Sequence, residues 1–320
     1  MKHFSSLAFA AVVASSAAIA ADLDMPTPYG DKTFHTANII EFAKEVGEAT
    51  DGKLNITVHS AGSLIKHPEI KNAVRGQQVP LGEFFLSRLS NEDAAYGIDS
   101  QPFVATSYED AAKLWQAQKP VITELLAKQS LMPLFSVPWP PQGLYTEGEI
   151  KNVDDLKGLK FRAYNAALEQ FAVLAGAAPT QVEAADIPQA FTTGQVEAMI
   201  TSPSTGANTK AWDFVTHYTP INAWVPKNIV VINKASFDAL ETDVQATVLE
   251  LAAKAETRGW EMSKKETEIK TSELVANGMI VVTPSDELLE GLKSIGKEMQ
   301  TSWQKSASDE AKAIAESFKQ

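Results

Sequence analysis

The stretch GLKFRAYN, residues 158–165, lies about halfway along the 320-residue chain. Its pattern predicts a short strand that is followed directly by a helix. Its strand-like half holds one guanidinium, Arg162, between apolar neighbours. Asn165 can cap the helix-like run that follows and that ends at Gly176. The start of a helix carries a partial positive charge, so this junction favours the binding of an anion beside Arg162.

Two interpretations of Arg162 are open. In the first, the side chain forms a structural salt bridge, with Asp154 or Asp155 as the nearest acids, which is the role of most arginines. In the second, its planar fork of donors holds a carboxylate by two parallel hydrogen bonds. The apolar flanks of Arg162 and the helix that follows it favour the second interpretation.

Outward from this stretch, strand-like and helix-like patterns alternate along most of the chain. Residues 54–58 alternate as a half-buried strand does, and residues 67–76 are typical of a helix with proline in its first turn. Ser107 begins a capping box and thus a helix, and Pro120 is expected to begin the next one. Asp186 is expected to cap a helix that ends near residue 194.

The later part of the chain is dominated by helical patterns. Apolar residues recur at helical spacing from Leu240 to Ala255, and with the charged stretch 264–270 they indicate one long helix or two abutting ones. A second amphipathic stripe covers residues 288–303. Alternating strands and helices of this kind predict an α/β fold with largely parallel sheets.

One break in composition stands near the middle of the chain, at VPWPPQG, residues 137–143. Three prolines in five residues cannot form a regular helix or a central strand, so the segment is a stiff extended crossing. It is either a surface loop or a connector between two lobes, with Trp139 and Gln142 facing the cleft. The sequence leaves both possibilities open.

Composition and the N-terminus restrict the class of protein. The net charge of −12 disfavours binding to nucleic acid, and the absence of cysteine excludes disulfides and thiolate chemistry. Residues 1–21 have the positive start, the short apolar run and the Ala-x-Ala ending of a secretory signal peptide. We expect export to the periplasm, with no membrane insertion of the mature chain.

The sequence contains no recognisable catalytic motif. The chain has no HExxH, GxSxG, GxxxxGK[ST] or GxGxxG pattern, and its five histidines lack the spacing of metal ligands on a helix. We therefore expect no catalytic residues, no metal and no cofactor. A secreted enzyme that acts on an organic acid remains the rival class, because catalytic groups can be assembled from distant residues.

Residues 155–162, DLKGLKFR, resemble the segment that carries the carboxylate-binding arginine in the solute-binding proteins of tripartite ATP-independent periplasmic (TRAP) transporters, of the C4-dicarboxylate-receptor type. Further fragments follow in the order that is typical of that family. They are EIKNAVRG at 69–76, DSQPF at 99–103, LAGAAP at 174–179, IPQAFTTGQVE at 187–197 and VVINK at 230–234. Together the fragments span nearly the whole chain after the signal peptide.

The resemblance implies a two-lobed periplasmic-binding-protein fold, with crossing hinge strands, a long helix spanning both lobes and the ligand enclosed between them. Lobe I would hold residues 22–139 and 228–267, and lobe II would hold 140–227 and 268–320. Lobe closure would capture the ligand, and TRAP membrane permease subunits would receive it. A sensory receptor that presents the ligand to a membrane kinase would have the same sequence features.

By the same resemblance, Arg162 would contact the ligand carboxylate from lobe II. The sequence departs from the family's pattern in two places, since GLY at 143–145 lacks a second arginine and the strand at 199–203 lacks an asparagine. The resemblance carries the contact of that asparagine over to Thr201 or Ser202, while Asn165 can instead be only the cap of its helix. The remaining ligand-binding candidates are polar or aromatic residues at junctions, of which the aromatic ones can instead serve core packing: Trp139, Gln142, Tyr145, Trp224, Glu83 and Phe84.

One arginine with several aromatic neighbours favours a monocarboxylate with an aromatic or apolar body. Micromolar affinity corresponds to about 8 kcal/mol, and a charge-assisted hydrogen bond supplies about 1.5–3 kcal/mol, so burial of the ligand body must supply much of the rest. A C4-dicarboxylate or a sugar acid is the alternative. A dicarboxylate would want a second cation, for which Arg75, Arg88 and Lys227 are candidates.

Overall fold

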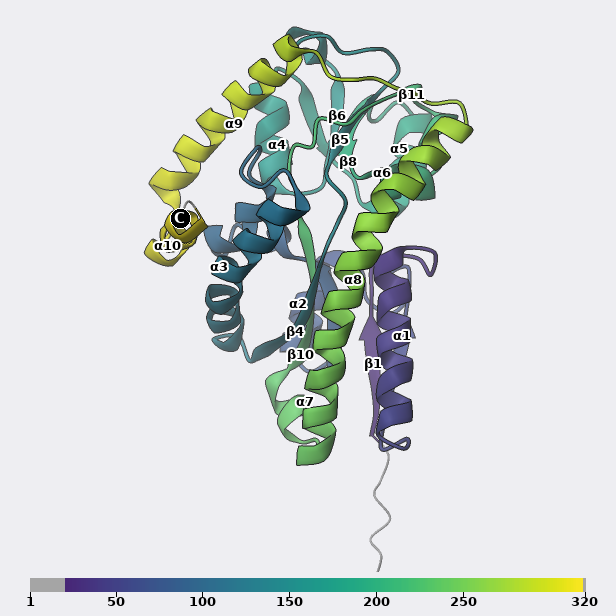
Figure 1. Ribbon diagram of the computed structural model, residues 1–320, viewed down its shortest axis with the longest axis vertical. Helices are drawn as coiled ribbons and strands as arrows, with labels where there is room; N and C mark the ends of the chain where they lie inside the picture. The colour runs from purple at the N-terminus through teal and green to yellow at the C-terminus, as the bar shows by residue number, and fades with distance from the viewer. Residues whose placement is uncertain (1–20, 319–320) are drawn as a thin grey trace, which may run out of the picture.

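The computed structural model describes residues 21–318 of the chain (Figure 1). The signal peptide predicted for residues 1–21 therefore lies, but for Ala21, outside the described residues. Within the described range, no helix is both long enough and apolar enough to cross a membrane.

The first lobe is built on two small sheets. β1 pairs in parallel with β2, while β10 lies between β3 and β4 and runs antiparallel to both. The elements of this lobe are β1 (Ala21–Pro26), α1 (Phe34–Ala49), β2 (Leu54–His59), η1 (His67–Glu69), α2 (Ile70–Arg75), β3 (Leu81–Phe85), η2 (Leu86–Leu89), η3 (Ala94–Ser100), α3 (Tyr108–Ala127), β4 (Leu131–Pro138), β10 (Lys227–Asn233) and α7 (Lys234–Asp238).

The second lobe is built on one six-stranded sheet of order β11-β9-β5-β8-β6-β7. Its elements are β5 (Gly143–Thr146), η4 (Val153–Leu156), β6 (Lys160–Ala163), α4 (Ala166–Leu174), β7 (Ala178–Gln181), η5 (Ala184–Asp186), α5 (Ile187–Thr192), β8 (Ala198–Thr201), α6 (Pro203–Asn208), η6 (Ala211–Asp213), β9 (His217–Thr219), β11 (Ile280–Val281) and α9 (Asp286–Ser306).

The α/β prediction is confirmed, but the sheets are mixed rather than largely parallel. β6 runs parallel to β7 and β8, whereas β5 runs antiparallel to β8 and β9. The two antiparallel strands, β5 and β10, have a common feature. The chain enters each of them directly from the other lobe, so each runs opposite to its neighbours in the sheet.

The segment VPWPPQG is a connector between the lobes, so its interpretation as a surface loop is wrong. It leads from β4 into β5 and runs beside the return segment that leads from β9 to β10. Backbone hydrogen bonds join the two, from Trp139 N to the Pro226 carbonyl at 2.8 Å and from Gln142 N to the Trp224 carbonyl at 3.0 Å. Residues of both crossings, Trp139, Gln142 and Pro226, line one cavity.

A single helix, α8 (Thr242–Ala276), spans both lobes, as the sequence predicts (Figure 1). Its 35 residues extend over about 52 Å at about 1.5 Å per residue. The first part packs against α1 and β4, and the later part packs against α6 of the second lobe. The helix is therefore a rigid strut along one side of the molecule.

Gly259 allows α8 to approach β4 closely. A Cβ atom built there would lie 2.4 Å from Cγ2 of Val137 and 2.8 Å from Nδ2 of Asn38. We expect Gly259→Ala to lower the free energy of unfolding by about 1–3 kcal/mol through overpacking, although alanine favours helix more than glycine does. Urea denaturation measures the change, and Gly148, which has open space around it and no positive φ, provides a control position.

Two helix boundaries differ from the sequence predictions. α3 runs without a break through Pro120. Its buried face, which includes Leu114, Ile122 and Leu126, packs into the hydrophobic core of the first lobe, and this packing offsets the loss of the hydrogen bond that proline removes. Asp186 adopts helical backbone angles and makes no side-chain cap for α5, since a 3₁₀ turn leads directly into that helix.

The last helix, α10 (Asp309–Phe318), lies with the first lobe and not, as predicted, with the second. Ala311 and Ile314 are buried in a core cluster that contains residues of α3 and η3. The small apolar face of α10 matches the surface of α3, which explains this return of the chain. The other boundaries of the two lobes stay a prediction.

Candidate functional site

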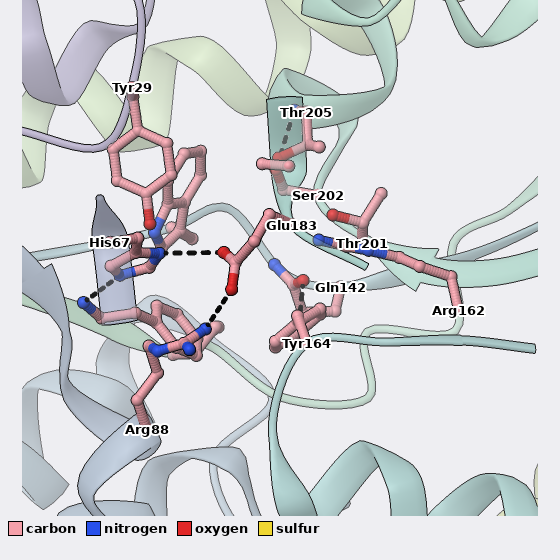
Figure 2. A pocket seen from close by; sticks show the side chains of 14 residues that line it. Tyr29, His67, Arg88, Gln142, Arg162, Tyr164, Glu183, Thr201, Ser202 and Thr205 are labelled. Atoms are coloured by element: carbon pink, nitrogen blue, oxygen red, sulfur yellow. Dashed lines mark hydrogen bonds and ion pairs between the residues drawn. The ribbon is translucent and has the colours of Figure 1, made fainter. Parts of the chain in front are cut away.

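A small cavity lies where the two lobes meet at the crossings (Figure 2). It offers about 50 Å³ to water-sized molecules, and a single water needs about 10–15 Å³. The site therefore has room for a small ligand. Its walls come from both lobes and from the crossings, and they consist of Tyr29, His67, Phe85, Arg88, Trp139, Gln142, Arg162, Tyr164, Glu183, Ala184, Thr201, Ser202, Thr205 and Pro226.

Arg162 lies in the wall of the cavity at the end of β6, and its side chain is 3% exposed. Its Nε donates to the carbonyl of Val182 at 3.0 Å, and the guanidinium lies 4.9 Å from the centre of the Tyr164 ring. Burial lowers the pKa of Arg162 to about 10, which leaves the side chain charged at neutral pH.

No carboxylate of the described residues pairs with Arg162. Asp154 pairs with Lys157 at 2.8 Å, and Asp155 accepts from the backbone N–H groups of Lys151 and Asn152. The salt-bridge interpretation of Arg162 is therefore wrong. Among residues 21–318, only Nε has a hydrogen-bond acceptor, so the two terminal nitrogens are available to a ligand.

Asn165 does not line the cavity, contrary to its inclusion among the ligand-binding candidates. Its Oδ1 accepts from Leu168 N at 2.8 Å, which makes it the cap of α4. Its Nδ2 donates to Oγ of Ser87, also at 2.8 Å. Since Ser87 belongs to the first lobe, Asn165 joins the two lobes beside the cavity rather than contacting its contents.

Gln142 and Tyr164 line the cavity, and Trp224 supports them from behind. Trp224 Nε1 donates to the Tyr164 hydroxyl at 3.0 Å, and that hydroxyl donates to Gln142 Oε1 at 3.2 Å. Trp224 itself is 1% exposed within the core of the second lobe. Its prediction as a lining residue is wrong, because its indole group faces the core and only its N–H points toward the site.

Trp139 lines the cavity, as predicted, while Glu83 lies behind the wall. Trp139 Nε1 donates to Oδ1 of Asn228 at 2.9 Å, and Nδ2 of Asn228 donates to Glu83 at 2.7 Å. Burial works to raise the pKa of Glu83, but its contacts with His35, Asn228 and Thr27 outweigh burial and hold the pKa below its ordinary value. Glu83 thus anchors the wall and does not line the cavity.

Thr201 and Ser202 line the cavity at the end of β8, as predicted. Ser202 also caps α6, since its Oγ accepts from Thr205 N at 3.0 Å. Tyr145 is fully buried, and its hydroxyl donates to the Ser202 carbonyl at 3.1 Å. The prediction that Tyr145 lines the site is wrong, because its ring packs against Tyr218 in the core.

The prediction that Phe84 lines the site is also wrong, by one position. It is buried in the core of the first lobe, whereas its neighbour Phe85 lines the cavity. Successive side chains of a strand point to opposite faces, and both faces of β3 are buried, so burial alone does not set the register.

The sequence did not single out Glu183 or His67, which join the lobes across the cavity with Arg88 (Figure 2). One oxygen of Glu183 lies 2.8 Å from Nη1 of Arg88, and the other lies 3.2 Å from Nδ1 of His67. Burial of Glu183 acts to raise its pKa, but His67 and Arg88 outweigh it and hold the pKa at about 2.

His67 is neutral with a defined tautomer. The backbone N–H of Phe85 donates to its Nε2 at 3.1 Å, so the ring proton lies on Nδ1 and is donated to Glu183. Burial lowers the pKa of His67, in keeping with a neutral ring.

The sequence contains one indication that Glu183 belongs to the site. Glu183 follows β7, the parallel neighbour of β6, and the carboxyl ends of parallel strands lie at one edge of a sheet.

The three candidates for a second cation lie in different environments. Arg88 lines the cavity but is paired with Glu183. Arg75 is exposed at the end of α2, and Lys227 is fully buried 3.1 Å from Asp99. Only Arg88 is placed to act beside Arg162.

Two lobes joined by paired crossings and a long helix, with a charged arginine in the cavity between them, define the class of two-lobed solute-binding proteins. The chain belongs to the bacterial extracellular solute-binding protein family 7, of the DctP type, whose model matches residues 28–310. It is a TRAP-type solute receptor, as the resemblance of the sequence predicts.

Several known proteins are similar to this chain. DctP6 of Bordetella pertussis, an extracytoplasmic solute receptor binding pyroglutamic acid, is 41% identical, with a TM-score of 0.92 over 93% of this chain and 99% of that one. A marine metagenome TRAP solute-binding protein specific for pyroglutamate is also 41% identical, with a TM-score of 0.91 over 94% and 99%. A solute-binding protein of Albidiferax ferrireducens is 24% identical, over 84% of this chain and 80% of its own.

These comparisons confirm the two-lobed α/β fold. The family and the similar proteins are receptors rather than enzymes, which agrees with the expectation from the sequence.

Proposed function

We propose that this protein captures a small monocarboxylate, pyroglutamate or a close analogue, between its lobes and delivers it to a TRAP membrane permease from the periplasm. The observation that carries the proposal is a buried arginine whose terminal nitrogens face the cavity without a protein carboxylate, Arg162.

The charges that line the cavity favour one negative charge on the ligand. Arg162 and Arg88 each contribute +1, Glu183 contributes −1 and His67 is neutral, so the sum is +1. Burial raises the pKa of both lining tyrosines, so these also stay neutral. A monocarboxylate balances this charge, whereas a dicarboxylate leaves an excess negative charge in a buried site.

The remaining walls suit a compact ring with polar groups. Phe85, Trp139 and Tyr164 offer apolar surface, while Gln142 and Thr201 offer hydrogen-bonding groups beside Arg162. A lactam ring has one donor and one acceptor besides its carboxylate, which fits this mixture. The small volume of the cavity favours such a ring over a large aromatic body, and the 41% identity to receptors of pyroglutamate supports the same choice.

Capture would occur by closure of the two lobes around the crossings. Arg162 from the second lobe would bind the carboxylate, and the first lobe would then cover the ligand with Phe85 and Tyr29. The ligand adds contacts to both lobes only in the closed form, so it shifts the equilibrium toward closure. The permease would receive the closed form.

Thermal unfolding with a panel of acids tests the proposal. At about 100 times its Kd, a ligand stabilises the folded state by about 2.7 kcal/mol, which raises the Tm by several degrees. We expect L-pyroglutamate to give this shift and succinate, L-malate and D-glucuronate to give none. A shift with benzoate would favour the aromatic body predicted from the sequence, and a shift with only succinate or malate would contradict the proposal. NMR of the mixture should show no turnover of the ligand.

A further inference from the structure

We infer that Glu183 is the residue that restricts this receptor to singly charged ligands, because it occupies the second arginine of the cavity. The inference rests on the proposed function and deepens it. Without Glu183, the site would present two free guanidinium groups, Arg162 and Arg88, from opposite lobes. Two such groups are the arrangement that a dicarboxylate requires.

The contacts of Glu183 show how Arg88 is occupied. Its carboxylate accepts from Arg88 Nη1 at 2.8 Å through one oxygen and from His67 Nδ1 at 3.2 Å through the other. His67 is held in place by the Phe85 backbone N–H, so it directs the carboxylate toward Arg88. Figure 2 shows Glu183 pointing away from Arg162 and toward these two partners. An internal carboxylate thus takes the place that a second ligand carboxylate would need.

The position of Glu183 in the chain adds to its effect. It follows β7 in the second lobe, whereas Arg88 and His67 lie in η2 and η1 of the first. The contacts therefore form only where the two lobes meet. A ligand with a second carboxylate would have to displace Glu183 from Arg88 and so remove a bond that holds the lobes together. A monocarboxylate leaves that bond intact.

The experiment compares wild-type protein with Glu183→Gln by isothermal titration, using L-pyroglutamate and glutarate as probes. Glutamine has nearly the same shape and can still accept from His67 through its carbonyl, while its amide cannot neutralise Arg88. We expect the ratio of the glutarate affinity to the pyroglutamate affinity to rise at least about tenfold. Glu290→Gln removes an equal charge from an exposed position of the same lobe and serves as the control.

The double variant Glu183→Gln/Arg88→Gln identifies the cause. It should lose the gain for glutarate, because no free second cation remains. A gain that persists in the double variant would contradict the role of Arg88. A Glu183→Gln protein that binds pyroglutamate but discriminates against glutarate as wild type does would overturn the inference while leaving the proposed function intact.

Arg88→Gln provides an independent test that does not depend on the folding of Glu183→Gln. It leaves Glu183 unneutralised and lowers the cavity charge from +1 to 0. We expect the pyroglutamate affinity to fall at least about tenfold and L-proline, a zwitterion with a similar ring, to gain affinity. An unchanged pyroglutamate affinity would overturn the inference. A wild-type protein that binds no monocarboxylate would instead overturn the proposed function, and the inference with it.

Discussion

We expect Arg162→Ala to lower the affinity for L-pyroglutamate at least about 100-fold. The variant would lose the two proposed charge-assisted hydrogen bonds to the ligand, each worth about 1.5–3 kcal/mol, in a site where the side chain is 3% exposed. Arg162→Lys keeps part of the affinity, because an ammonium supplies the charge without the planar fork. Isothermal titration measures both changes.

The control for Arg162 is Arg75→Ala, which removes an exposed guanidinium at the end of α2 and should leave the titration unaltered. An Arg162→Ala protein that binds pyroglutamate as wild type does would remove the basis of the proposed function. A circular dichroism spectrum equal to that of wild type would show that the loss of binding is not a loss of fold.

We expect Asp99→Ala to lower the free energy of unfolding by about 3–5 kcal/mol, since it leaves the Lys227 ammonium without a counter-charge. Both side chains are fully buried, and Nζ of Lys227 lies 3.1 Å from Oδ2 of Asp99. Asp99 also accepts from the backbone N–H of Lys227 at 3.1 Å, so it fixes the start of β10 at the return crossing. Burial raises the pKa of Asp99, and Lys227 opposes that shift.

Urea denaturation measures the effect of Asp99→Ala, with Glu109→Ala as the control. Glu109 forms an exposed pair with Lys113, which contributes little to stability. The double variant Asp99→Ala/Lys227→Met should recover much of the lost stability, because no unpaired charge is left in the interior. If Asp99→Ala unfolds at the same urea concentration as wild type, the buried pair has no role in holding the crossing.

The long helix, the crossing and the position of Arg162 could be predicted from the sequence because each has a local cause. Helical periodicity indicates α8, three prolines dictate an extended segment, and a strand that turns into a helix places Arg162 at the end of β6. Thr201 lines the cavity for the same reason, since it ends the adjacent strand β8. That these residues contact the ligand stays a proposal.

The remainder of the cavity depends on long-range pairing that local patterns do not contain. Glu183 and His67 are 116 residues apart, and only the meeting of the lobes makes them partners. The residue types of Trp224 and Glu83 favour a place in the wall, yet both lie behind it. Trp224 holds the lining Tyr164, and Glu83 holds Asn228, which in turn holds the lining Trp139. A sequence identifies a polar residue near a junction but not the direction in which its donor or acceptor points.

The return of α10 to the first lobe limits how the molecule can open. Within residues 21–318 the chain passes between the lobes four times: at residues 139–142, at residues 220–226, along α8, and from α9 to α10. Free rotation of one lobe relative to the other would break the packing of at least one of these links. If the lobes close as proposed, we expect these links to restrict the movement to a bend in one direction, so that the same paired faces would meet the transporter at each closure.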